Sequence, residues 1–397
     1  MNDTTPLAPT TSTLSRRHRW QNLIAATACV TVFGFALGEM FPLLSLIMER
    51  EGVSPEVIGI NSAMQPIGIL FAGFVIPPAV RAFGARPVVL AAAVLAALIV
   101  LTYPFAPIFW GWFGLRVLHG LAVATLFSIS EAWVVQYADG AYRGRIVAIY
   151  GSVLAVSFGL GPTVIYLAGT EGILAFVIGS CVLLAATVPI FFVRIERPSE
   201  EEDHAASFFT FAPKAPVLLA AVGVFAVFDA ACLGFLPVYG VKKGLGEETA
   251  AILISALAFG NVLLQPPIGW LADLYPKRTI MAICAVLTAV FSMILPETVG
   301  TVWMWVVLVI IGATSVGIYT VALAELGERF QGADLVAGTA AMSTMWGGGA
   351  LVGALLTGWV FEAFGPDAFP RALSIVLASF LVVMALRARA KRRRAMA

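Results

Sequence analysis

The sequence predicts an all-α membrane protein in which twelve transmembrane helices form two pseudo-symmetric six-helix bundles. Of its 397 residues, 60% are hydrophobic and only 12% are charged, whereas soluble domains carry about 25% charged residues. The mean hydropathy is +0.94, so a soluble chain of this length would lack the polar residues to cover its surface. The apolar residues also form continuous runs of about 20, which is the length of a membrane-crossing helix, rather than the alternating pattern of a barrel.

Charged residues and Gly or Pro turns separate twelve apolar runs. Because backbone groups in lipid must bond to one another, we expect each run to be a helix. The helices are predicted near residues 22–48, 57–79, 86–105, 109–138, 143–168, 172–193, 215–240, 247–273, 277–296, 301–327, 333–364 and 367–386. The N-terminal bundle then covers 22–193 and the C-terminal bundle 215–386, with an N-terminal segment 1–21, a linker 194–214 and a basic tail 387–397.

The basic residues predict the orientation of these helices. With twelve spans, 19 of the 24 Lys and Arg residues fall on the side of the chain termini, in the ends, the even-numbered loops and the tail. Four fall on the opposite side, and Arg116 lies inside a span. Because positive loops remain in the cytoplasm, we expect a multi-pass protein of the cell inner membrane with both termini cytoplasmic.

The two halves are predicted to be repeats. A shift of 192 residues superimposes several residues of one half on identical residues of the other. The pairs are Phe33 and Phe225, Gly52 and Gly244, Glu56 and Glu248, Gly68 and Gly260, Arg86 and Arg278, Gly120 and Gly312, Gly140 and Gly332, and Gly161 and Gly353. Parallel six-helix repeats place a binding site between the halves, near the middle of the bilayer.

A loop motif follows the eighth span. It begins at Gly269 and carries Asp273, Lys277 and Arg278, with Pro276 between them. It resembles the cytoplasmic loop signature of the major facilitator superfamily, G-x-x-x-D-x-x-G-R-[KR], although Pro276 stands where the family usually has Gly. The resemblance implies a cytoplasmic gate in which the acid and the basic residues bond to neighbouring helix ends; a plain topogenic loop is the alternative.

Three further segments resemble the family. The first-half loop carries Arg86, but Arg81 stands where the family has Asp, which puts a gate built on that acid in doubt. Span four has the R-x-x-x-G pattern from Arg116 to Gly120. Span five carries Gly159, Gly161 and Pro162, which resemble the Gly-Pro motif of the family's exporters without its final pair of glycines.

Two charged residues lie inside the first half. Glu39 on span one and Arg116 on span four have similar depths from the side opposite the termini, so we expect them to face each other. His119 lies about one turn from Arg116 on the same face. Ionisable groups in spans usually line a bundle interior. Glu39 is therefore predicted to exchange a proton while Arg116 tunes its affinity, with a permanent ion pair as the alternative.

Three further acids inside the spans are candidates. Asp229 lies close to the midplane of span seven with no cation nearby in sequence, and is predicted to bind substrate or a proton; a satisfied contact to a neighbouring helix is the alternative. Glu131 and Glu325 lie toward the cytoplasmic ends of spans four and ten, and Arg329 follows Glu325 at i+4. For both acids we expect a gate or structural network.

Other polar or aromatic residues give weaker signals. Gln65 and Gln265 are candidates for lining the cavity. Each lies in an Asn-x-x-x-Gln-Pro segment, but the two segments are 200 residues apart, which conflicts with the repeat of 192. Trp346 is a cavity candidate, with core packing as its alternative.

The composition excludes an ordinary soluble enzyme, a nucleic-acid binder and a disordered scaffold. No Walker A motif, metal cluster or catalytic triad is found in the sequence. We expect no cofactor and no metal, a monomer, and a small-molecule substrate, protons and the lipid bilayer as partners. The family resemblance implies a secondary active transporter working by alternating access. Proton-coupled export is favoured; nutrient uptake and a non-transporting sensor on the same fold are the alternatives.

Overall fold

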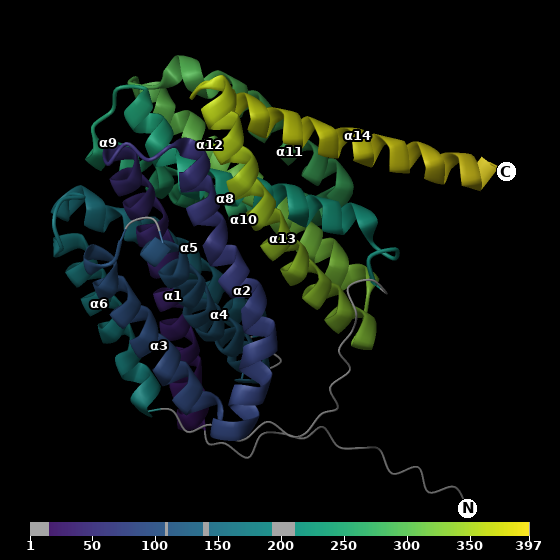
Figure 1. Ribbon diagram of the computed structural model, residues 1–397. Helices are drawn as coiled ribbons and strands as arrows, with labels where there is room; N and C mark the ends of the chain where they lie inside the picture. Colours follow the sequence, from purple (N-terminus) through teal and green to yellow (C-terminus); the bar gives the residue numbers. More distant parts are fainter. Residues whose placement is uncertain (1–15, 108–109, 138–142, 193–210, 397) are drawn as a thin grey trace, which may run out of the picture.

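The computed structural model describes residues 16–107, 110–137, 143–192 and 211–396, and this part of the chain is helical without strands (Figure 1). Twelve of its helices are long and apolar enough to cross a membrane. The predicted all-α fold and the predicted number of spans are therefore confirmed. Residues 194–210 of the predicted linker lie outside the described part.

The first half contains six spans. They are α1 (Arg16–Arg50), α2 (Pro55–Phe83), α3 (Ala85–Thr102) with the 3-10 turn η1 (Tyr103–Phe105), α4 (Trp110–Tyr137), α5 (Arg143–Ala168), and α6 (Leu174–Thr187) with η2 (Val188–Phe192). The second half contains α8 (Pro216–Lys242), the short α9 (Glu247–Ala251) leading into α10 (Leu253–Leu274), α11 (Lys277–Thr298), α12 (Val302–Arg329), α13 (Gly332–Phe364) and α14 (Ala368–Met396).

Both ends of the chain are more helical than the sequence pattern indicated. Helix α1 begins at Arg16, inside the predicted N-terminal segment, and α14 continues to Met396 through the predicted tail. The physical reason in α14 is that residues 372–396 contain no Gly or Pro and are rich in Ala, Leu and Arg, all of which favour helices. Charge marks where the apolar run ends, but it does not end the helix.

The repeat appears in the structure as matching helix crossings. Helix α2 crosses α4 in the first half, and α10 crosses α12 in the second. At both crossings, glycines allow the backbones to approach so closely that an added Cβ would overlap a carbonyl of the partner helix. The overlaps pair Gly68 with Val117 and Gly260 with Val309, and Gly120 with Gln65 and Gly312 with Leu257. Each residue lies 192 positions from its counterpart, so the two bundles repeat each other in detail.

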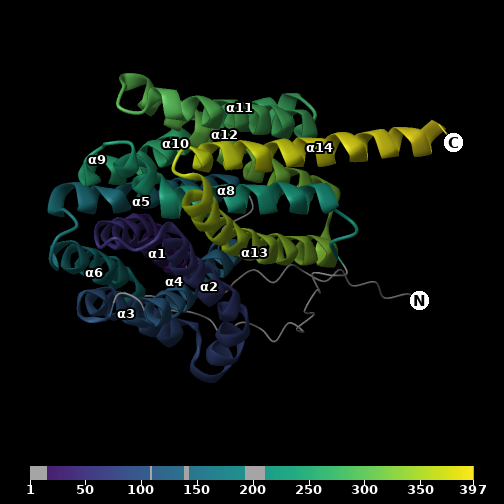
Figure 2. The same ribbon diagram turned by 45° about the horizontal axis from the view of Figure 1, so that its top comes forward.

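The two halves lie side by side, with α2 packed on α13 and α5 on α10 (Figures 1 and 2). We call the end of the molecule at which α1 begins and α14 ends the termini side, and the end at which α1 ends the distal side. Ion pairs between the halves are found on the distal side: Lys242 lies 2.6 Å from Glu49, and Arg50 lies 3.6 Å from Glu247. The halves are thus held together at that end.

Candidate functional site

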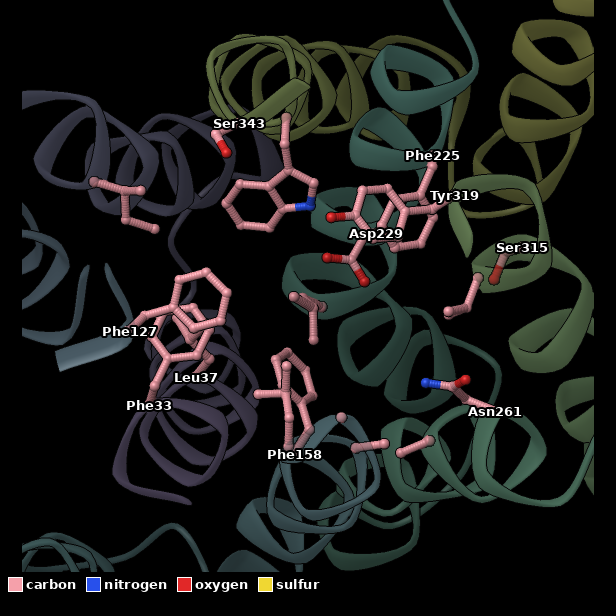
Figure 3. Close-up of a pocket in the computed structure, with 18 of the residues that line it drawn as sticks. Phe33, Leu37, Phe127, Phe158, Phe225, Asp229, Asn261, Ser315, Tyr319 and Ser343 are labelled. Atoms are coloured by element: carbon pink, nitrogen blue, oxygen red, sulfur yellow. The ribbon is translucent and has the colours of Figure 1, made fainter. Parts of the chain in front are cut away.

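A cavity of about 450 Å³ lies between the two halves (Figure 3). Four helices of the first half line it, namely α1, α2, α4 and α5. Their counterparts α8, α10, α12 and α13 line it from the second half. The cavity therefore has walls from both repeats, which is the position predicted for a binding site.

The cavity is open toward the termini side. Glu131 of α4 and Ser343 and Thr344 of α13 line its termini-side part, and all three are exposed. Toward the distal side it is lined by residues such as Leu37 and Ile254, each only 2% exposed. With the ion pairs beyond them, these apolar residues close the distal end.

Two aromatic pairs face each other across this cavity. Phe33 stacks on Phe127 in the first half, with ring centroids 4.5 Å apart, and Phe225 packs on Tyr319 in the second half at 5.3 Å. Each second-half residue lies 192 positions after its counterpart, and Figure 3 shows the pairs on opposite walls. Trp346, a cavity candidate from the sequence, lines the cavity and also packs against the apolar core, which was its alternative. Sequence reasoning missed the second aromatic residue of each pair. Applying the repeat offset of 192 to Phe127 would have identified Tyr319 as its counterpart.

Asp229 of α8 supplies an acid to the same cavity. Its carboxyl group points inward between the aromatic walls (Figure 3). It makes no hydrogen bond or ion pair with any described residue, so the alternative of a satisfied contact to a neighbouring helix is wrong. At the symmetry-equivalent position the first half has Leu37. The cavity is therefore symmetric in its aromatic walls and asymmetric in charge.

Arg116 is buried in α4, but not beside Glu39. Its Nε donates to Asn61 Oδ1 at 3.1 Å, and its Nη1 donates to Gln65 Oε1 at 3.0 Å and to the Met40 carbonyl at 3.3 Å. The expectation that Glu39 and Arg116 face each other is therefore wrong, and so is its alternative, a permanent ion pair between them. The two residues have similar depths, but depth does not fix the direction in which a side chain leaves its helix.

Glu39 points instead toward α6. It is fully buried, and neither of its carboxyl oxygens has a hydrogen-bond partner. The carboxyl group occupies the space that a Cβ would take at Gly179. Glu39 therefore lies inside the first half, between α1 and α6, and does not line the cavity.

The remaining polar candidates of the spans lie behind the cavity wall. His119 Nδ1 lies 3.3 Å from Gln65 Nε2, and both residues are completely buried. Gln265 donates to the Ala313 carbonyl at 3.0 Å and accepts from Thr320 at 3.0 Å. The prediction that the two glutamines line the cavity is wrong, because each binds a neighbouring helix instead.

The second-half loop motif forms a network on the termini side. Glu325 of α12 accepts from Arg278 at 3.1 Å and from Arg329, four residues on, at 2.9 Å. Lys277 lies 2.5 Å from Glu328. Asp273 is exposed and makes no bond to a described residue. The predicted network therefore forms around the glutamates of α12 rather than around the motif acid.

The first-half loop is built differently. Arg86 donates to the Phe191 carbonyl, which ties α3 to the end of α6, and Arg81 is exposed. Glu131 lies at the mouth of the cavity rather than in a loop network. The gate candidates with a bond described here all bond within their own half. They are Arg86, Lys277, Arg278, Glu325 and Arg329.

The bonds that join the halves lie on the distal side, and sequence reasoning missed them. Besides the two ion pairs, Glu247 accepts from Thr170, and Thr170 in turn accepts from Arg50 at 2.5 Å. The signal in the sequence was the presence of opposite charges at the end of span one and around the turn between spans seven and eight, on the side where the topology leaves few basic residues.

The span-five motif packs on both halves. A Cβ at Gly161 would overlap the α1 backbone at Glu39, and one at Gly159 would lie 2.9 Å from the Ala258 Cβ of α10. Ser255 donates to the Gly159 carbonyl at 2.6 Å. Pro162 is buried inside α5, in the same turn. The motif therefore lies where α5 meets the other half.

No group of His, Cys, Asp or Glu residues that could hold a metal ion occurs within the described ranges. The described residues form a solute cavity that is closed on the distal side and lined by two acids, Asp229 deep inside and Glu131 at the mouth, neither bonded to a described residue.

Comparison with known proteins identifies the family. The chain matches the family model of the Major Facilitator Superfamily over residues 24–258 and 242–396. The chain belongs to this family. It is a multi-pass membrane transporter rather than an enzyme. Among curated relatives, the uncharacterised MFS-type transporter YfkF of Bacillus subtilis (strain 168) is 24% identical over 348 residues, which cover 84% of this chain and 87% of the relative.

Other matches agree. The uncharacterised MFS-type transporter YcaD of Escherichia coli O7:K1 is 25% identical over 263 residues, or 65% of this chain and 68% of the relative. Among solved structures, the nucleoside transporter NupG has a TM-score of 0.72 at 14% identity, covering 94% of this chain and 98% of that one. A D-xylose-proton symporter has a TM-score of 0.71 at 14% identity, covering 92% and 97%. These structures confirm the fold.

Proposed function

We propose that this protein is a proton-coupled exporter of a small solute in the cell inner membrane. The observation that carries the proposal is the cavity between the repeats, which is open on the termini side and closed on the distal side. The bias of basic residues supports a cytoplasmic location for the termini side. With that orientation, we take this conformation as the inward-facing state of the proposed alternating-access cycle, in which solute enters from the cytoplasm.

Alternating access requires a closure that breaks on one side as another forms. The distal ion pairs of Lys242 with Glu49 and of Arg50 with Glu247 join the halves. They are partly exposed, and such pairs contribute only about 0–1 kcal/mol each. The distal closure can therefore open at low cost when a second set of contacts forms on the cytoplasmic side.

Proton coupling is assigned first to Asp229. A carboxylate without a partner in an apolar site is costly to bury, and either a proton or a bound solute relieves that cost. If both use the same carboxyl group, each excludes the other, and exchange of one for the other across the membrane is antiport. Glu39 is the second acid of this scheme, since it is buried and unpartnered, but it acts from within the first half.

Export is favoured over uptake by the span-five residues Gly159, Gly161 and Pro162. Their resemblance to the motif of the family's exporters is supported by their position, because α5 meets α10 of the other half at Gly159. Movement of the halves changes this contact directly.

The test is transport by purified protein in liposomes that contain a pH-sensitive dye, with an inside-acidic gradient and a panel of solutes. We expect solutes of the right class to release protons from the vesicles. Asp229→Asn should abolish this release and Glu39→Gln should lower it, because each removes a carboxyl group that can carry a proton.

Solute-dependent proton release that survives Asp229→Asn would contradict the role of that residue, and release that is unchanged in Glu39→Gln would remove Glu39 from coupling. Solute and proton moving in the same direction would establish symport and therefore uptake. Absence of flux for every solute, in protein shown to be folded, would favour the sensor alternative. Glu362→Gln, an exposed carboxyl change on α13, is the matched control.

A further inference from the structure

We propose that the solute bound in the central cavity is a bulky organic monocation with aromatic or other apolar substituents. This inference rests on the proposed function and names the substrate class of the same site. It combines the charge of the cavity, its aromatic walls and its size.

The charge of the lining is negative only. Asp229 and Glu131 are both among the lining residues, and no Lys, Arg or His is. Arg116 and His119 lie behind the wall, bonded to residues of α1 and α2. An anion entering the cavity would meet carboxyl groups with no compensating cation, whereas a cation would provide the partner that Asp229 lacks.

The walls suit a cation that carries apolar groups. The Phe33–Phe127 pair and the Phe225–Tyr319 pair present rings from opposite sides, and Asp229 lies between them (Figure 3). An aromatic face attracts a cation within about 6 Å of its centre, most strongly where water is excluded. Small hydrated cations gain little here, because most of the lining is apolar and cannot replace their water.

The size of the cavity suits a drug-sized solute, and the single acid between its aromatic walls suits one positive charge on that solute. The cavity volume of about 450 Å³ falls in the range of sites for drug-sized molecules, about 300–1,000 Å³. The two repeats supply equivalent aromatic pairs, but at the position between those pairs only the second repeat supplies an acid, since Leu37 is the first-half counterpart of Asp229. Glu131 lies at the open mouth, where its charge attracts a cation entering from the termini side.

The test compares two ions of the same shape and opposite charge. Radiolabelled tetraphenylphosphonium and tetraphenylborate are dialysed to equilibrium against the full-length protein in detergent, with protein-free micelles subtracted. We expect the phosphonium ion to bind at least tenfold more tightly than the borate. Asp229→Asn should weaken phosphonium binding at least tenfold, and Asp229→Glu should keep it within threefold. Phe225→Leu should weaken it severalfold, and Glu362→Gln should leave it unchanged.

Borate binding as tight as phosphonium binding would overturn the inference, as would full phosphonium binding by a folded Asp229→Asn variant. If that variant does not fold, the comparison of the two ions on the wild-type protein decides. Failure here is separable from failure of the proposed function. Proton release driven only by neutral or anionic solutes would keep the exporter and discard the cation, whereas phosphonium binding without proton release would do the reverse.

Discussion

The crossing of α2 with α4 and the crossing of α10 with α12 have the same backbone geometry, but the side chains buried beside them differ in polarity. In both, paired glycines let the helices touch through their backbones. Beside those glycines the first half buries polar residues where the second half has apolar ones. The counterparts are Asn61 and Leu253, Gln65 and Leu257, Arg116 and Leu308, and His119 and Ile311. Backbone contact thus determines the crossing, and the side chains around it are free to diverge.

The buried polar residues of the first crossing depend on one another for their hydrogen bonds. Arg116 holds acceptors from α1 and α2 together, whereas each leucine of the second crossing packs without a specific partner. Asn61 Nδ2, Arg116 Nη2 and His119 Nε2 are also buried without a hydrogen bond to a described residue. A buried network that is only partly satisfied is sensitive to the loss of any member. We therefore expect the two crossings to respond differently to mutation.

The largest effect is expected for Arg116→Leu, which places the second-half residue in the first half. It leaves two buried side-chain acceptors, Asn61 Oδ1 and Gln65 Oε1, without their donor, and each such loss costs about 1–3 kcal/mol. We expect the free energy of unfolding, measured by SDS titration in mixed micelles, to fall by about 3 kcal/mol or more.

The control is the complete exchange of the interior, Asn61→Leu with Gln65→Leu, Arg116→Leu and His119→Ile. Replacing every partner by apolar groups leaves few unsatisfied groups, so this variant should recover at least half of the lost stability. If the quadruple variant were as unstable as Arg116→Leu, the apolar side chains would require the second-half backbone. The view that the two crossings share one backbone geometry would then be wrong.

A smaller effect, equal in both halves, is expected for Gly68→Ala and Gly260→Ala. Each added Cβ would overlap a backbone carbonyl, and overpacking of this kind costs about 1–3 kcal/mol. Gly114→Ala and Gly269→Ala are controls on α4 and α10, because nothing lies within 4 Å of a Cβ there. Loss of stability at only one of the two crossings, in the same titration, would contradict the shared geometry.

The smallest effect is expected where the second half is the more polar one. Thr288 donates to Thr314 at 2.8 Å, whereas the first half has the buried Ala96 and Ala122 at the equivalent positions. Each hydroxyl also bonds to a carbonyl of its own helix. Thr288→Ala should therefore cost only about 0.5–1.5 kcal/mol.

Thr288→Ala with Thr314→Ala should cost little more than Thr288→Ala alone, because both remove one contact. A loss from the single change that equals the loss expected for Arg116→Leu, measured under the same conditions, would mean that polar contacts are equally critical in both halves. The contrast between the crossings would then disappear.

Periodicity and charge in the sequence predicted the fold well. The number of spans follows from runs of apolar residues, and the repeat follows from a constant offset, both of which are properties of the chain alone. The cavity residue Asp229 was within reach because depth along a helix can be counted, whereas Trp346 was a candidate only by its residue type.

Sequence reasoning failed where the direction of a side chain decided the contact. Glu39 and Arg116 have matching depths but leave their helices toward different neighbours, α6 and α2. Gln65 was expected in the cavity but bonds to Arg116 behind its wall. Such directions depend on how the helices are rotated against one another, which close packing in three dimensions decides.

Helix α14 has a mechanical consequence. Its 29 residues span about 44 Å at 1.5 Å per residue, which exceeds the roughly 30 Å of the hydrocarbon core. The helix packs on α11, α13 and α8 along its membrane part, and its basic end extends from the bundle without a break (Figure 1). Because the helix is continuous, a partner that binds its last turns would transmit a force directly to the second bundle.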